Sequence, residues 1–354
     1  MKQHNMKKTT FFLAFVLAFI FAGAQDFHFS LFNENPLNIN PAQTGAFPGD
    51  HRVVINYKNQ WQSISEPFRT YSGSYDAGIF KKEAETGYLS AGLQFLTDKA
   101  GTSEFNTTKV DVLVAYHVVL GLSSTLSAGI SGGFCQRSMN ESALYWDNQY
   151  DGTGGFNTST PSGETSIFEN FGYGDFSAGL MYSYATQESA MASNDGVKFN
   201  IGGAAYHINT PKLSFSASDI EKLFAKFVVH TRAQIGLFST NTSLVVQGLF
   251  ANQGPTRELV AGLGFRFMLS EQSHYTGFIK ESALTIGGAY RFGDAFIPQI
   301  GLEISNFAFG VGYDFNTSGL TVASDGRGGL EVFFRFINPS PFRYQNKSFN
   351  KSFF

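Results

Sequence analysis

Ionisable side chains recur at alternate positions in segments of this sequence that are otherwise apolar. Alternation places them on one face of a strand, with large apolar residues on the other. The residues predicted to share this polar face are Arg52, Lys58, Lys109, Asp111, Arg232, Arg266, Arg291, Asp314, Glu331 and Arg335. One interpretation is that these residues, together with Asp76, form ion pairs. The other is that they create an electrostatic field that orients a plug or a passing ligand. Ion pairs are the favoured interpretation.

Residues that could bind a metal or perform catalysis do not form a recognisable pattern. His117, His207 and His230 lie in separate segments without metal-ligand spacing. "DNQYDG" (147–152) begins like a calcium loop, but its twelfth position is Thr158 rather than glutamate, so calcium stays a minor alternative. No nucleophile elbow, phosphate loop or Ser/His/Asp set has supporting context. The sequence therefore predicts neither an enzyme nor a cofactor or metal site.

The amino terminus indicates export. Lys2, Lys7 and Lys8 precede an apolar run ending at Ala22, which is shorter than the roughly 20 residues of a membrane-spanning helix. Residues 1–24 are therefore predicted to be a signal peptide cleaved before Gln25. The net charge of −3 without a basic run argues against a nucleic-acid partner, and the single cysteine, Cys135, excludes an internal disulfide.

Strands must position these charges, because period-two alternation recurs along the whole chain. With 39 Phe, 15 Tyr, 38 Gly and only 15% charged residues, the large apolar face is mostly aromatic and the other face is small or ionic. Unpaired charges sealed in a sandwich core would cost several kcal/mol each, whereas a barrel lumen can hydrate them. The candidate strands are 52–60, 68–77, 87–97, 105–118, 125–135, 173–186, 197–208, 225–238, 242–252, 257–268, 281–292, 296–304, 307–315 and 327–337.

This pattern predicts an all-β fold: a transmembrane antiparallel β-barrel of about 14 strands over residues 52–337, in the outer membrane of a Gram-negative bacterium. If the first strand runs outward, the longest connections, 136–172 and 209–224, and the Gly-rich 316–326 face the exterior. Residues 338–354 are then a periplasmic tail.

The outer connection 136–172 contains the best candidates for partner binding. Tyr145, Trp146, Tyr150 and Phe156 are the kind of aromatic residues that anchor protein interfaces. For Tyr145 and Trp146, an aromatic girdle at the lipid boundary is an equal alternative.

Residues 25–51, between the signal peptide and the first strand, contain "NENPLNINPAQTG". Asn35-Pro36 and Asn40-Pro41 favour extended backbone followed by a turn, and Gly45 closes the stretch. Asparagine amides can both donate and accept hydrogen bonds where no strand or helix forms. These features predict an ordered plug-like segment, with a simple linker as the alternative.

Several stretches in order along the mature chain resemble the PorP/SprF family of outer-membrane proteins of type IX secretion and gliding motility in the Bacteroidetes. They include "QDFHFSLFNENPLNINPAQTG", "RVVINYKNQW", "AGLQFLTDKAG", "YWDNQYDG", "GGAAYHINTP" and "GLEVFFRF". The resemblance implies a non-catalytic barrel that supports secretion or surface attachment of a secreted protein or adhesin by binding its type IX C-terminal signal domain. It also implies contact with periplasmic components of the system, besides outer-membrane lipid. A passive channel for small or lipophilic solutes is the alternative.

Overall fold

The structure, a computed structural model, describes residues 26–338 except 63–65, 80, 82–85, 102, 122, 141–142, 164–169, 187–195, 217–218, 271–281 and 320. The predicted signal peptide, 1–24, lies outside the described residues, as does the predicted tail, 338–354, except Asn338, which is the last residue of the final strand.

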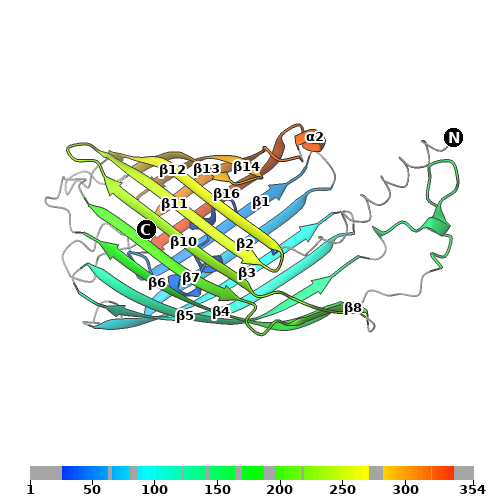
Figure 1. The fold of residues 1–354 in the computed structure, drawn as a ribbon, viewed down its shortest axis with the longest axis horizontal. Helices are drawn as coiled ribbons and strands as arrows, with labels where there is room; N and C mark the ends of the chain where they lie inside the picture. Colours follow the sequence, from blue (N-terminus) through cyan, green and yellow to red (C-terminus); the bar gives the residue numbers. More distant parts are fainter. Residues whose placement is uncertain are drawn as a thin grey trace, which may run out of the picture.

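Fourteen antiparallel strands close into one barrel (Figure 1). They are β1 (His51–Gln60), β2 (Phe68–Ile79), β3 (Gly87–Ala100), β4 (Phe105–Val119), β5 (Ser124–Ser138), β6 (Phe171–Ala185), β7 (Val197–Tyr206), β10 (Lys226–Gly236), β11 (Thr242–Gln253), β12 (Thr256–Ser270), β13 (Ser282–Arg291), β14 (Ala295–Ile304), β15 (Phe307–Asn316) and β16 (Arg327–Asn338). β1 pairs with β16 along its whole length and closes the barrel, which confirms the predicted fold and strand count.

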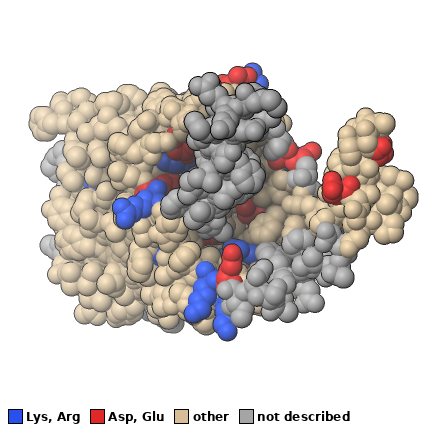
Figure 2. Space-filling view, turned by 45° about the vertical axis from the view of Figure 1, so that its right-hand side comes forward, with Lys and Arg blue, Asp and Glu red and all other residues tan. Residues whose placement is uncertain are grey.

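The alternation of each strand explains why the sheet closes with its large side chains outward. On β15, Phe307 and Phe309 are exposed on the outer surface, whereas Ala308 is buried. Figure 2 shows the barrel wall as mostly uncharged, in agreement with a surface that contacts lipid. Closure also satisfies the backbone groups of every strand edge, which hydrocarbon could not hydrate.

Two elements were not anticipated within the predicted outer loops. A short hairpin of β8 (Lys212–Ser216) and β9 (Asp219–Lys222) forms within 209–224, and the short helix α2 (Thr321–Ser324) forms within 316–326. Both are too short to produce a clear periodic signal. In the part of the chain that the structure describes, no helix has the length and apolar character needed to cross a membrane.

Residues 26–50, hereafter the lumenal segment, lie inside the barrel and contain three single turns of 3-10 helix (Figure 1). These are η2 (Phe32–Glu34), η3 (Pro36–Asn38) and η4 (Pro41–Gln43). Pro36 and Pro41 each occupy the first position of a turn, where a missing N–H costs nothing and a fixed φ is favourable.

Candidate functional site: the lumenal segment and the barrel wall

The lumenal segment is packed against the wall by apolar side chains. Phe32 and Ile39 join a buried cluster that includes Val228, Leu249 and Ile297 from the strands. Residues of the segment line two cavities, whose volumes are about 20 and 30 Å³. Each has room for little more than one or two water molecules. Along these two cavities the segment therefore leaves little free volume between itself and the wall.

Asn40 makes several polar contacts with the wall, and its side chain is fully buried. Its Nδ2 group donates to the carbonyls of Leu180 and Gly203, at 2.9 and 3.3 Å, and lies 3.1 Å from Nε2 of His230. Its Oδ1 atom accepts from the N–H of Ala42 and caps η4. One asparagine thus fixes the turn and attaches it to three strands.

Asn35 and Gly45, also predicted from the Asn-Pro motif, contact the opposite wall. Asn35 donates to Oγ of Ser72 at 3.1 Å. The N–H of Gly45 donates to Oδ2 of Asp76 at 2.7 Å, and its φ of +71° favours glycine. A Cβ atom there would also overlap Ser90, so both backbone conformation and space require glycine.

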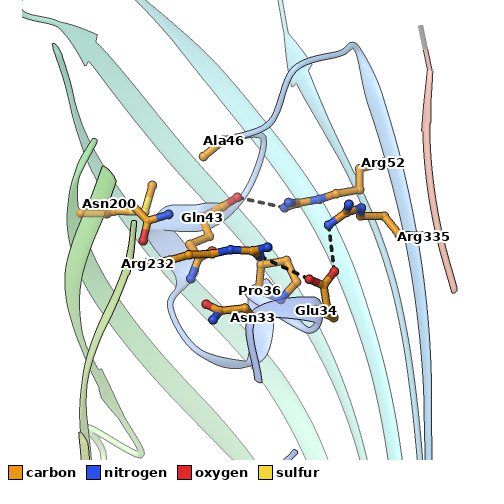
Figure 3. A pocket seen from close by; sticks show the side chains of 10 residues that line it. Asn33, Glu34, Pro36, Gln43, Ala46, Arg52, Asn200, Arg232 and Arg335 are labelled. Atoms are coloured by element: carbon orange, nitrogen blue, oxygen red, sulfur yellow. Dashed lines mark hydrogen bonds and ion pairs between the residues drawn. The ribbon is translucent and has the colours of Figure 1, made fainter. Parts of the chain in front are cut away.

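Glu34, the only charged residue in the motif, lies between two arginines from opposite sides of the lumen (Figure 3). Its carboxylate is 3.2 Å from Arg232 on β10 and 2.8 Å from Arg335 on β16. Arg335 is 3.6 Å from Glu303, which pairs with Arg266 at 2.7 Å. Five charges from four strands and the segment therefore form one continuous network.

A second group holds the end of the segment that leads into β1. Arg52 is bidentate to Asp76, with a shortest distance of 2.7 Å, and donates to the carbonyl of Gln43 at 3.0 Å (Figure 3). Lys81, in the turn after β2, donates to the carbonyls of Gly45 and Phe47. Burial, together with the nearby Arg52 guanidinium, lowers the pKa of Lys81 to about 7.

A third group surrounds Ser30 on the strands next to the barrel closure. The backbone N–H groups of Ser30 and Leu31 both donate to the Glu331 carboxylate, at 2.7 and 2.9 Å. Oγ of Ser30 donates to Asp314 at 2.8 Å and accepts from Arg291 at 2.6 Å. Lys58, also predicted for this face, donates to the same hydroxyl at 3.3 Å.

From the sequence, the inward-facing charges are interpreted either as ion pairs or as groups that orient a plug. In the structure they do both, because they pair with one another and also bind the lumenal segment. Lys109 pairs with Asp111 at 3.2 Å and with Asp175 at 2.8 Å. Sequence reasoning missed Asp175, Glu303 and the pairing of Glu34. Asp175 could have been found, since it alternates with apolar residues in "YGDFSAG". The partners of Glu34 could not, because they come from distant strands.

The predicted aromatic residues lie elsewhere, in the connection between β5 and β6. The Phe156 ring centroid is 5.0 Å from that of Tyr145 and 5.4 Å from that of Tyr150. The exposed fraction of the side chain is 65% for Tyr145, 49% for Tyr150 and 44% for Phe156. Trp146 is half-buried and precedes a single 3-10 turn, η6 (Asp147–Gln149). The aromatics therefore form an exposed cluster apart from the lumen.

The possible calcium loop is organised by its own hydrogen bonds. Oδ1 of Asp151 accepts hydrogen bonds from the N–H groups of Thr153 and Gly155. The Gln149 side chain accepts a hydrogen bond from the N–H of Trp146 and donates one to the carbonyl of Thr160. Across the described ranges, no group of three or more His, Cys, Asp or Glu residues could hold a metal ion.

The close approach of η4 to the wall gives a direct test of the packing. A Cβ atom on Gly129 of β5 would overlap the Pro41 carbonyl, whereas one on Gly73 of β2 meets nothing within 4 Å. Gly129→Ala is expected to lower the free energy of unfolding by about 1–3 kcal/mol, as over-packing does. Gly73→Ala, the matched control, should change it by less than about 0.5 kcal/mol. Equal effects in urea unfolding of the refolded barrel would contradict this packing.

Comparison with known proteins places the chain in a family. The family model described as type IX secretion system membrane protein PorP/SprF matches residues 21–336. No curated protein sequence matches the chain.

Solved barrels are only distantly similar. The Ralstonia pickettii toluene transporter TbuX is 8% identical over 86% of this chain and 92% of its own, with a TM-score of 0.45. The monoaromatic hydrocarbon channel CymD is 11% identical over 86% and 92%, with a TM-score of 0.44. BamA from Haemophilus ducreyi is 9% identical over 82% and 70%, with a TM-score of 0.41. At these scores the similarities carry no argument about function. The family model, in contrast, matches nearly the whole chain. This outer-membrane β-barrel therefore belongs to the PorP/SprF family of type IX secretion system membrane proteins.

Proposed function

We propose that this barrel is a non-catalytic component of type IX secretion that supports secretion or surface attachment of a partner protein. Membership of the family implies partners within that system. The partner's C-terminal signal domain binds at the mouth of the barrel that carries the long connections. The observation that carries this proposal is that the lumenal segment occupies the lumen and packs against its wall, because a folded domain cannot enter a barrel occupied in this way.

The exposed aromatic cluster is the proposed binding surface. The connection between β5 and β6 extends beyond the wall of the barrel (Figure 1). It carries Tyr145, Tyr150 and Phe156, whose side chains are exposed and lie close together. Aromatic side chains supply a large contact area at a small cost in conformational entropy, which is why they dominate interface energetics. A secreted or adhesive partner would cover this cluster. Periplasmic components would contact the opposite end, where the short turns lie.

A passive channel is less well supported as the working state. Conduction needs a continuous path of water, and the two cavities found beside the described segment each hold only one or two water molecules. In this proposal the segment acts as a plug that keeps the outer membrane sealed while the mouth binds its partner.

Truncation of the aromatic cluster tests the binding surface. The triple variant Tyr145→Ala, Tyr150→Ala and Phe156→Ala is expected to reduce partner recovery with the affinity-captured barrel by about tenfold or more, because interface aromatics are frequent hot spots. Phe292→Ala, which removes another exposed aromatic from the same end, should leave recovery unchanged. Normal recovery with the triple variant, in a barrel that still assembles, would exclude this cluster as the interface.

A further inference from the structure

The lumenal segment crosses the barrel from one end to the other, and its contacts give its direction. At one end, the N–H of Asp50 donates to the carbonyl of Asn338, where β16 ends and β1 is about to begin. At the other end, the N–H of Asp26 donates to Oε1 of Gln253, the last residue of β11. Because β11 and β16 run in opposite directions, their last residues lie at opposite ends of the barrel. Asp26 and Asp50 therefore lie at opposite mouths.

The mouth next to Asp26 is the one that carries the long connections. It bears the β5–β6 connection, the β8–β9 hairpin and α2, all at the right-hand end of Figure 1. The other mouth bears tight turns such as Leu237–Asn241 and Ser305–Asn306. Outer-membrane barrels place long connections outside and short turns in the periplasm. By this rule Asp26 lies at the external mouth.

Asp26 is held there by side chains of the wall. Its Oδ2 atom is 3.2 Å from Nζ of Lys226 and 3.3 Å from Nε2 of His207. Nδ1 of His207 is in turn 2.8 Å from Asp175, which pairs with Lys109 at 2.8 Å. The side chain of Asp26 is 15% exposed. We call Asp26, Lys226 and His207 the mouth latch.

The two ends of the segment are attached differently. At the inner end the segment continues covalently into β1, and Arg52 and Lys81 bind its backbone carbonyls. At the outer end the described chain is held by the mouth latch and the Gln253 contact, and from His28 onward also by Lys58 and the Ser30 group. Loss of the mouth latch would therefore release at most Asp26 and Phe27, because the segment is anchored to the wall from His28 onward.

We infer that the lumenal segment is threaded through the closed barrel with its amino-terminal end at the cell surface, where the mouth latch holds it. With the predicted cleavage before Gln25, Asp26 is the second residue of the mature chain. The surface at the outer mouth thus includes the amino-terminal end of the lumenal segment. β1 must close on β16 around the segment during assembly. This inference does not depend on the identity of any secreted partner.

Cysteine accessibility in intact cells tests the threading. In a Cys135→Ser background, Phe27→Cys places a thiol beside the latch. Val322→Cys in α2 and Phe238→Cys in an inner turn are matched controls, since the native side chains are 92% and 85% exposed. A membrane-impermeant maleimide should label Phe27→Cys and Val322→Cys from outside, and Phe238→Cys only after permeabilisation. Labelling of Phe27→Cys only after permeabilisation would overturn the inference.

The latch has a second test in the same strain. Asp26→Asn removes the charge that binds Lys226 and His207, so it should raise the labelling rate of Phe27→Cys about tenfold, as expected for loss of a charge-assisted contact. Asp151→Asn, an exposed change in the β5–β6 connection, should leave the rate unchanged. Equal rates with and without the Asp26 charge would overturn the latch. An epitope inserted after Gln25, detected by antibody on intact cells, checks surface display if the cysteine variants assemble poorly.

Discussion

Deletion of residues 26–47 is expected to convert a closed barrel into an open channel. In planar bilayers the full-length protein should show almost no conductance, whereas the deletion variant should show discrete steps at least about tenfold above that background. The physical reason is that fourteen strands enclose a lumen wider than its own side chains can fill. Without the segment, water and ions would reach the inward-facing Arg52, Arg232 and Arg335.

The deletion keeps β1 and the closing pair with β16, so the barrel itself should still assemble. A shift in electrophoretic mobility on heating checks this. Deletion of residues 143–160, which removes an outer connection without touching the lumen, is the matched control and should remain silent. A folded deletion variant that does not conduct would show that the lumenal segment is not what seals the barrel.

Removal of the Asp76 carboxylate should cause a large loss of stability for a single substitution. Asp76→Ala leaves the buried Arg52 guanidinium without its bidentate partner and also removes the acceptor of the Gly45 N–H. Breaking a buried ion pair from one side costs about 3–5 kcal/mol. Urea unfolding of the refolded barrel in detergent should show this as a lower midpoint.

Two further variants separate charge from packing. Arg52→Met combined with Asp76→Leu removes both charges and should recover most of the lost stability, because no uncompensated charge stays buried. Glu104→Ala removes one partner of the Lys99–Glu104 pair, whose side chains are both 47% exposed, and should have no measurable effect. If Asp76→Ala were as mild as Glu104→Ala, the Arg52 contacts would not secure this end of the segment.

The sequence alone determined the barrel. Each strand alternates large apolar residues with small or ionic ones, and this local pattern fixes which face meets lipid. Strand ends were found to within a few residues: β1 begins at His51 and β16 ends at Asn338, each one residue beyond the predicted barrel. The ten predicted inward-facing charges follow from the same alternation. Successive side chains of a strand point to opposite faces, so each side chain faces either the lipid or the lumen.

Only the tertiary structure decided what those charges bind. Glu34 meets Arg232 and Arg335, which lie 198 and 301 residues away in sequence, and Ser30 meets Asp314 across 284 residues. No periodic signal encodes such contacts, because they depend on where barrel closure brings distant strands together. The direction of the lumenal segment is also a tertiary property. Its Asn-Pro motifs specify turns through local sterics and capping, but the side chains of the closed wall place Asp26 at one mouth and Asp50 at the other.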